Sequence, residues 1–211
     1  MVVERAVPPL EAGDRLGRAE FHRRYLATPR LRKAELVEGI VYVPSPLHLS
    51  AHAEPHAAAG LWLSTYALAT PGVRVADNAT VVLDAANEVQ PDLLARIADP
   101  RTGRSRVGPD GFLHGPPELI VEIAASSASY DVHAKRGAYE RLGVAEYAIW
   151  RTLDGAIDWW RLERGRYAAL PPDAAGIVAS DVMPGLVLDV PRMIAGDLAR
   201  VVDALRAGLG H

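Results

Sequence analysis

The spacing of apolar residues alternates between patterns typical of β-strands and patterns typical of α-helices, which predicts a mixed α/β protein. Short apolar or alternating runs, typical of strands, cover residues 35–44, 73–77, 80–83, 91–97, 118–125, 146–151, 156–163 and 167–170. Segments of helical composition cover residues 14–27, 47–68, 131–142 and 197–209. Residues 99–117, rich in Gly, Pro and Arg, predict an exposed loop, and residues 126–129 predict a turn. The pattern indicates one α/β domain with a central mixed β-sheet flanked by helices.

A single carboxylate, Glu122, interrupts the most apolar of these runs, residues 119–124. Strand alternation places Glu122 on the same face as Glu118, Ile120 and Ala124. An ionised carboxylate buried there is costly unless it is paired or binds a metal. A salt bridge to one of the many arginines is the structural alternative, because ion pairs are common at strand ends.

A second carboxylate, Asp92, follows Pro91 at the mouth of another predicted strand. Two carboxylates converging from adjacent strands form a hard oxygen site suited to Mg²⁺. Such an ion polarises a phosphoryl oxygen and generates hydroxide from bound water. Lys135 lies on the first turns of the helix after the Glu122 strand, from which its stem can reach the site and offset charge on phosphate. The alternative is that Lys135 is a solvated helix residue.

Lysine is scarce in this chain. Of 23 cationic residues only two are lysines, so 23 − 2 leaves 21 arginines. The ammonium group is a compact point charge that can approach a reacting oxygen, whereas the guanidinium is a wide planar fork. A lysine retained close to two unusual carboxylates is therefore a candidate for chemistry.

Composition narrows the class of protein. With 211 residues, 49% of them apolar and 23% charged, the chain fits one globular domain. We expect a tail over residues 1–13, the main domain over 14–190, and a helical segment over 191–211 packed on that domain. The absence of cysteine excludes disulfides and thiolate sites. No signal peptide and no apolar run of about 18 residues occurs, so we expect a cytoplasmic protein without a membrane span.

Three other features suggest competing sites. His48, His52 and His56 follow at intervals of four, which on one helix face suggests zinc, although Pro55 makes a continuous helix uncertain. Serines in residues 126–129 suggest a serine hydrolase, but no Gly-x-Ser-x-Gly elbow is present. Trp159-Trp160 can stack on bases, although paired aromatics on late strands more often pack in a core or at an oligomer interface. The formal net charge of −3 does not itself indicate nucleic-acid binding.

Several short segments match a known family in order and spacing. They are Glu35-Leu-Val-Glu38-Gly, Pro44-Ser-Pro with His52 downstream, Pro91-Asp92, Glu118-Leu-Ile-Val-Glu122-Ile, the stretch from Tyr130 through Lys135 to Tyr147, and Pro184-Gly-Leu-Val-Leu-Asp189. Across residues 14–190 the chain resembles the Uma-two family of restriction-endonuclease-like proteins, within the PD-(D/E)XK nuclease superfamily.

This resemblance implies a restriction-endonuclease-like fold and a metal-dependent endonuclease that hydrolyses phosphodiester bonds in DNA. It implies Asp92 and Glu122 as ligands of Mg²⁺, with Mn²⁺ as a substitute, and Lys135 as the catalytic cation. Glu38 matches an acidic position that helps to hold metal or water. A homodimer is expected, because duplex cleavage needs two cuts and C2 dimers are common.

The chain also departs from the family pattern. Ala124 stands where the strict motif has its lysine, so that role passes to Lys135. The turn at residues 125–129 differs from the usual Ser-Pro-Ser-Thr, and Ala148 and Arg151 replace a Trp and an Asp. Two further hypotheses therefore stay open: a catalytically inactive binding or regulatory module on the same fold, and a metal hydrolase of smaller phosphoesters.

Overall fold

The computed structural model describes residues 7–44, 48–125 and 131–210, and within them the strands form two six-stranded sheets and one two-stranded sheet. The large sheet has the order β12 (Arg166–Ala169), β11 (Ala156–Glu163), β10 (Glu146–Arg151), β9 (Leu119–Ala124), β6 (Leu93–Ile97), β3 (Val73–Asp77). The small sheet has the order β2 (Ile40–Tyr42), β1 (Glu35–Val37), β5 (Glu88–Val89), β4 (Val81–Val82), β8 (Leu113–His114), β7 (Arg106–Val107). The third sheet pairs β13 (Ile177–Ala179) with β14 (Val187–Asp189).

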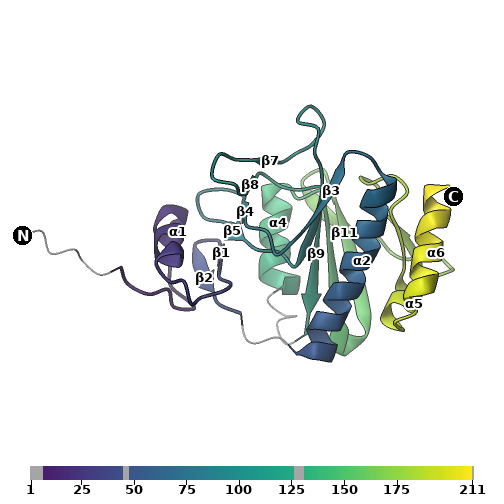
Figure 1. Ribbon diagram of the computed structural model, residues 1–211, viewed down its shortest axis with the longest axis horizontal. Helices are drawn as coiled ribbons and strands as arrows, with labels where there is room; N and C mark the ends of the chain where they lie inside the picture. Colours follow the sequence, from purple (N-terminus) through teal and green to yellow (C-terminus); the bar gives the residue numbers. More distant parts are fainter. Residues whose placement is uncertain (1–6, 45–47, 126–130, 211) are drawn as a thin grey trace, which may run out of the picture.

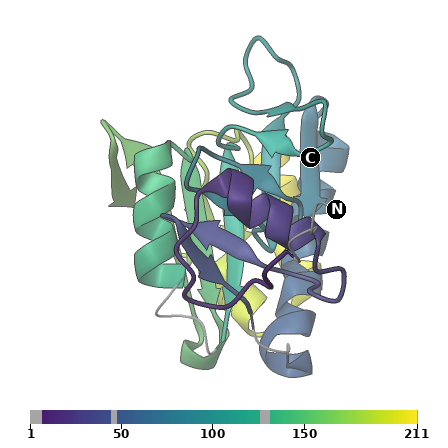
Figure 2. The same ribbon diagram turned by 90° about the vertical axis from the view of Figure 1, so that its left-hand side faces the viewer.

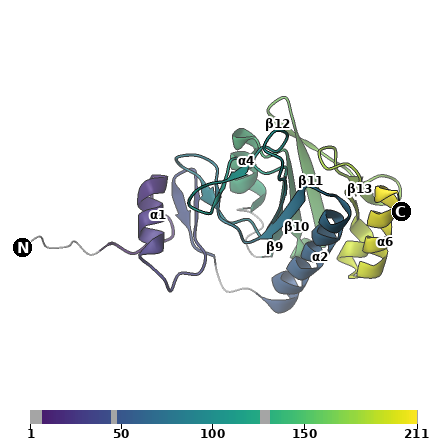
Figure 3. The ribbon, with the colours of Figure 1, turned by 45° about the horizontal axis from the view of Figure 1, so that its top comes forward.

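Helices cover both faces of the large sheet (Figures 1 and 3). The helices of the described residues are α1 (Arg18–Leu26), which packs on the β1–β2 hairpin, and α2 (Glu54–Ala69), α4 (Arg136–Leu142), α5 (Val190–Ile194) and α6 (Leu198–Leu209). There are also π-helical turns η1 (Leu49–Ala53) and η2 (Asp131–Lys135) and a 3-10 turn η3 (Thr152–Asp154). Figure 3 shows α4 on one side of the large sheet and α2 with α6 on the other. Seen from the N-terminal side, α1 lies in front of the β1–β2 hairpin (Figure 2).

Strand β9 is the centre of the large sheet, and its two faces enter two different hydrophobic cores. Leu119, Val121 and Ile123 pack with residues of α2 and α6. Ile120 and Ala124 pack with residues of α4 and of the small sheet. Every β9 residue is buried, which explains why the strand is apolar at all positions except Glu122. The alternation predicted from sequence is therefore confirmed, and Glu122 belongs to the face between the large sheet, α4 and the small sheet.

Several predicted elements differ in their limits. The first helix begins at Arg18 rather than Asp14, because Gly17 before it is extended (φ −80°, ψ 157°). Residues 99–117 contain the short strands β7 and β8, which join the small sheet instead of remaining a loop. The hairpin turn at Glu38-Gly39 and the end of α4 at Gly143 (φ 84°) are as expected. The turn predicted at residues 126–129 lies outside the described residues.

The C-terminal helices pack against the rest of the domain. Trp62 on α2 donates from Nε1 to the Val187 carbonyl oxygen, at 2.8 Å, and so ties α2 to β14. Val201 and Leu205 of α6 are buried in the core that α2 shares with the large sheet. No helix among the described residues has the length and apolarity needed to cross a bilayer.

Candidate active site

Asp92 and Glu122 face each other from neighbouring antiparallel strands. The β6–β9 register pairs Leu93 with Val121, and continuing it by one residue brings Asp92 opposite Glu122. The Ile123 backbone N–H donates to Asp92 Oδ2 at 2.9 Å, and the Asp92 N–H donates to Glu122 Oε2 at 3.3 Å. Both side chains are buried. Each carboxylate is thus held by the backbone of the other's strand.

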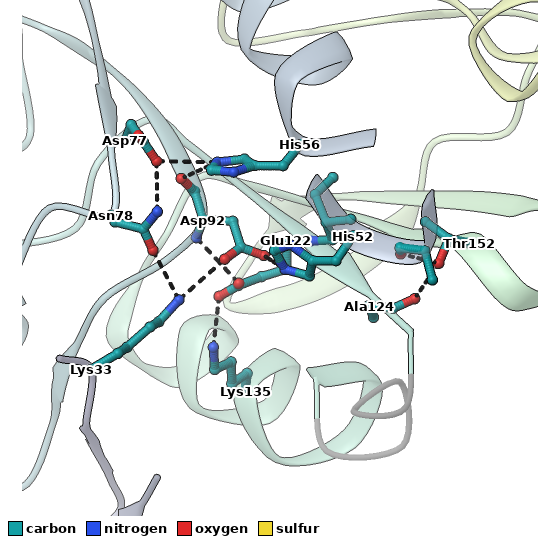
Figure 4. A network of polar contacts seen from close by, with 12 residues as sticks. Lys33, His52, His56, Asp77, Asn78, Asp92, Glu122, Ala124, Lys135 and Thr152 are labelled. Atoms are coloured by element: carbon teal, nitrogen blue, oxygen red, sulfur yellow. Dashed lines mark hydrogen bonds and ion pairs between the residues drawn. The ribbon is translucent and has the colours of Figure 1, made fainter. Parts of the chain in front are cut away.

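Both lysines of the chain reach these two acids (Figure 4). Lys135, the last residue of η2, places Nζ 2.9 Å from Glu122 Oε1. Lys33, in the segment before β1, places Nζ 3.1 Å from Asp92 Oδ1. The structure brings Lys135 to the position expected from sequence. Lys33 was missed, although the scarcity of lysine applies equally to both residues.

A third buried acid, Glu35, completes the cluster. Its Oε2 lies 2.8 Å from Lys135 Nζ, and its Oε1 accepts from the Gln90 N–H at 2.8 Å. Glu35 follows Lys33 by two residues, so extended chain directs both side chains to the same side. Three carboxylates and two ammonium groups leave this cluster with a formal charge of −1.

Glu38 lies outside this cluster, contrary to the prediction that it lies beside the metal ligands. Its side chain is 52% exposed and pairs with Arg141. Its backbone is in the left-handed region (φ 53°) because it forms the β1–β2 turn. The acid of this hairpin that enters the cluster is Glu35, since it lies within the strand and not at the turn.

The three histidines do not form a zinc column. His52 Nε2 lies 3.2 Å from Asp92 Oδ2, and His56 Nε2 lies 3.1 Å from both the Asp92 carbonyl oxygen and Asp77 Oδ1. His48 is exposed. Two of the three therefore position Asp92. Across the described part of the chain, no three His, Asp or Glu side chains are arranged as a ready-made metal site.

The charge states follow from these contacts. Burial opposes ionisation of Asp92, but the hydrogen bond from His52 and the charge of Lys33 outweigh it, so the pKa of Asp92 is lowered. Burial likewise opposes the charge of Lys33, yet Asp92 and Glu35 raise its pKa. Burial raises the pKa of Tyr139 well above its usual value, and its hydroxyl donates to Glu122 Oε1 at 3.1 Å. At neutral pH the cluster therefore holds an Asp92 carboxylate, a Lys33 ammonium and a neutral Tyr139 donor.

A family comparison classifies the chain. The model of the Uma2 family, described as "Putative restriction endonuclease", matches residues 18–191. The chain belongs to the Uma2 family. Its structure is similar to the crystal structure of "a putative nuclease belonging to DUF820" from Anabaena variabilis, with a TM-score of 0.58 and 13% identity, covering 77% of this chain and 89% of that chain. No curated protein matches the sequence. The resemblance inferred from sequence and the restriction-endonuclease-like fold are both confirmed.

The donor set of this Uma2 protein fits a hard divalent cation, although its oxygens already have partners. All four carboxylate oxygens accept hydrogen bonds. Asp92 Oδ1 accepts from Lys33, and Asp92 Oδ2 accepts from His52 and from the Ile123 N–H. Glu122 Oε1 accepts from Lys135 and Tyr139, and Glu122 Oε2 accepts from the Asp92 N–H. Carboxylate oxygens are the ligands that Mg²⁺ prefers. The formal charge of −1 on the cluster also favours a cation. A metal bound here would compete with the ammonium groups for the same oxygens.

The remaining candidates of the Uma2 chain have structural roles or lie outside the described residues. Trp159 packs edge-on against Trp62 and donates from Nε1 to Glu146. Trp160 stacks on Tyr147. Trp159 is therefore a core residue, whereas Trp160 is partly buried and has Arg136 over its ring, at 5.1 Å from the ring centroid. The serines considered for a hydrolase lie in residues 126–129, outside the described residues.

Proposed function

We propose that this Uma2 protein is a metal-dependent endonuclease that hydrolyses phosphodiester bonds in DNA. The observation that carries the proposal is the pair of buried acids, Asp92 and Glu122, fixed opposite each other with Lys135 Nζ at 2.9 Å from Glu122. Asp92 and Glu122 would hold Mg²⁺ or Mn²⁺. When bound, the ion polarises a phosphoryl oxygen and makes water more acidic.

The chain's own residues supply the other parts of the chemistry. Lys135 is held by Glu35 and Glu122, so its ammonium is fixed before substrate arrives. A preorganised cation offsets negative charge that develops on phosphate and orients water, at little reorganisation cost. Tyr139 donates to Glu122 and keeps that carboxylate in place. Glu35 takes the assisting part that the family pattern gives to Glu38, by positioning Lys135.

DNA is the proposed partner because of the family and of the charges near the site. Arg30 and Arg32 are exposed in the segment that leads to Lys33, where cationic side chains can contact phosphates. We also propose a C2 homodimer, which would cut both strands of a duplex. Sedimentation at several protein concentrations measures the mass, and a monomer throughout the range contradicts the dimer.

The test is cleavage of plasmid DNA by purified protein with Mg²⁺, with Mn²⁺ or with chelator. We expect nicking that needs metal and that Glu122→Gln abolishes, with loss of Mn²⁺ binding by calorimetry. Glu38→Gln removes an equal charge from the exposed turn and should retain both properties. A folded parent protein that binds neither metal and cuts no DNA refutes the proposal. If the protein cleaves RNA or a small phosphodiester but not DNA, those molecules replace DNA as the proposed substrate.

A further inference from the structure

The cation position beside Asp92 is already filled, by a side chain of the protein itself. Lys33 Nζ lies 3.1 Å from Asp92 Oδ1 and 3.1 Å from Asn78 Oδ1 (Figure 4). One carboxylate oxygen and one amide oxygen thus hold a positive charge between them. Both oxygen types are ligands that hard divalent cations accept.

Asn78 is fixed so that its oxygen faces this position. Its Nδ2 donates to Asp77 Oδ1 at 2.7 Å, which leaves Oδ1 directed at the cation. Its backbone N–H donates to the Asp92 carbonyl oxygen at 3.1 Å. Asn78 also has φ 48°, in the left-handed region that Asn tolerates better than most residues. Side chain and backbone together hold Asn78 in place against Asp92.

The two lysines differ in how easily each can leave. The Lys33 side chain is 23% exposed, and Asp92 is the one carboxylate it pairs with among the described residues. The Lys135 side chain is 3% exposed and pairs with both Glu35 and Glu122. The Lys33 side chain already reaches solvent, where its charge can stay hydrated, whereas the described residues enclose Lys135. Lys33 is therefore the exchangeable cation of the cluster.

We propose that Asn78 and Asp92 form a divalent-cation niche, and that Lys33 fills this niche until a metal displaces it. Lys33 then acts as an internal competitor that sets the affinity for metal. The inference rests on the proposed function, because it concerns the metal of that same site. The exchange swaps one cation for another and involves no covalent step. Metal can bind only the molecules in which Lys33 has left the niche. The apparent Kd for metal therefore equals the intrinsic Kd divided by the fraction of molecules with an open niche.

Calorimetric titration of Mn²⁺ into metal-free protein tests this competition. Lys33→Met should bind Mn²⁺ about tenfold or more tightly than the parent, if Lys33 fills about nine niches in ten. Arg32→Met is the matched control, since it removes the same charge from an exposed side chain one residue away. It should leave the Kd within about twofold, because charges in solvent are strongly screened.

The role of Asn78 as a metal ligand is tested in the Lys33→Met variant, in which the competing ammonium group is absent. Asn78→Gly removes the amide oxygen but keeps the left-handed backbone, because Gly adopts positive φ freely. Losing one ligand should weaken Mn²⁺ binding at least about tenfold, because loss of a residue that only orients a metal ligand already costs about 10- to 100-fold in affinity. An unchanged Kd would remove Asn78 from the niche. Thermal unfolding by circular dichroism confirms that each variant is folded, and Lys33→Gln replaces Lys33→Met if the latter does not fold.

The outcomes separate this inference from the proposed function. If the parent, Lys33→Met and Arg32→Met bind Mn²⁺ equally well, the competition is refuted while the metal site stands. If no folded variant binds Mn²⁺, both proposals fail. If Lys33→Met binds Mn²⁺ and the parent does not, the niche is supported, but the proposal that the parent protein is a metal-dependent enzyme is refuted.

Discussion

Replacing Lys135 with methionine is the most direct test of the buried ion pairs. Lys135 Nζ lies 2.8 Å from Glu35 Oε2 and 2.9 Å from Glu122 Oε1, and all three side chains are buried. Methionine fills similar space without charge, so two carboxylates lose their shared cation. Removing one partner of a buried pair typically costs about 3–5 kcal/mol. In a domain of this size each kcal/mol lowers Tm by about 2–4 °C, so we expect a loss of about 6–20 °C.

Urea and thermal unfolding at pH 7, followed by circular dichroism, measure this loss. Lys33→Met is the internal comparison and should lose less, because Lys33 is partly exposed and pairs with one carboxylate. Adding Glu35→Gln to Lys135→Met should regain part of the stability, since it removes one of the stranded charges. At a temperature where the variant is folded, DNA cleavage should fall about 10²- to 10⁴-fold.

Two results would refute this reasoning separately. A Lys135→Met protein within about 1 kcal/mol of the parent would mean that the ammonium does not compensate two buried acids, since such a change typifies exposed pairs. A destabilised Lys135→Met variant that still cuts DNA at the parent rate would mean that Lys135 stabilises the fold but takes no part in catalysis.

Two further predictions concern the acids. Glu35→Gln should lower the rate of DNA cleavage at least about tenfold, because Lys135 loses one of the two carboxylates that hold it. Glu38→Gln, measured side by side, should cleave within about twofold of the parent rate, because substitutions at exposed sites have small effects. Equal losses in the two variants would mean that Glu38 belongs to the site. The lowered pKa of Asp92 means that its charge stabilises the fold above about pH 4 and that this contribution is lost as the pH falls further. The stability difference between the parent and Asp92→Asn, from urea unfolding in chelator, should therefore shrink below about pH 4, and a difference as large at pH 3 as at pH 7 would contradict it.

The large sheet and its acids were open to prediction because their signals are local. The alternation in residues 119–124 fixes the face of Glu122, and an apolar run of that length is typical of a central strand. Asp92 directly precedes a strand, which a proline and a run of apolar residues mark. What the alternation cannot supply is the pairing of β6 with β9, and it is this register that brings the two carboxylates together.

Strands β5, β7 and β8 of the small sheet escaped prediction because they are too short to show a period. Strands β4, β5, β7 and β8 have two residues each, and pairing with distant segments holds them in place. Lys33 was missed because its partner, Asp92, is 59 residues away in sequence. Glu35 and Glu38 are equivalent by composition, and only the position of the turn distinguishes them.

The site is assembled from segments spread over residues 33–135. During synthesis the chain emerges from its N-terminus, so the ribosome releases Lys33 and Glu35 long before Lys135. Contacts between distant segments also form slowly in folding. A nascent or truncated chain that ends before η2 therefore carries Asp92 and Glu122 without the cation held between Glu35 and Glu122. Whatever chemistry the cluster performs with this cation therefore needs a chain that extends at least through η2.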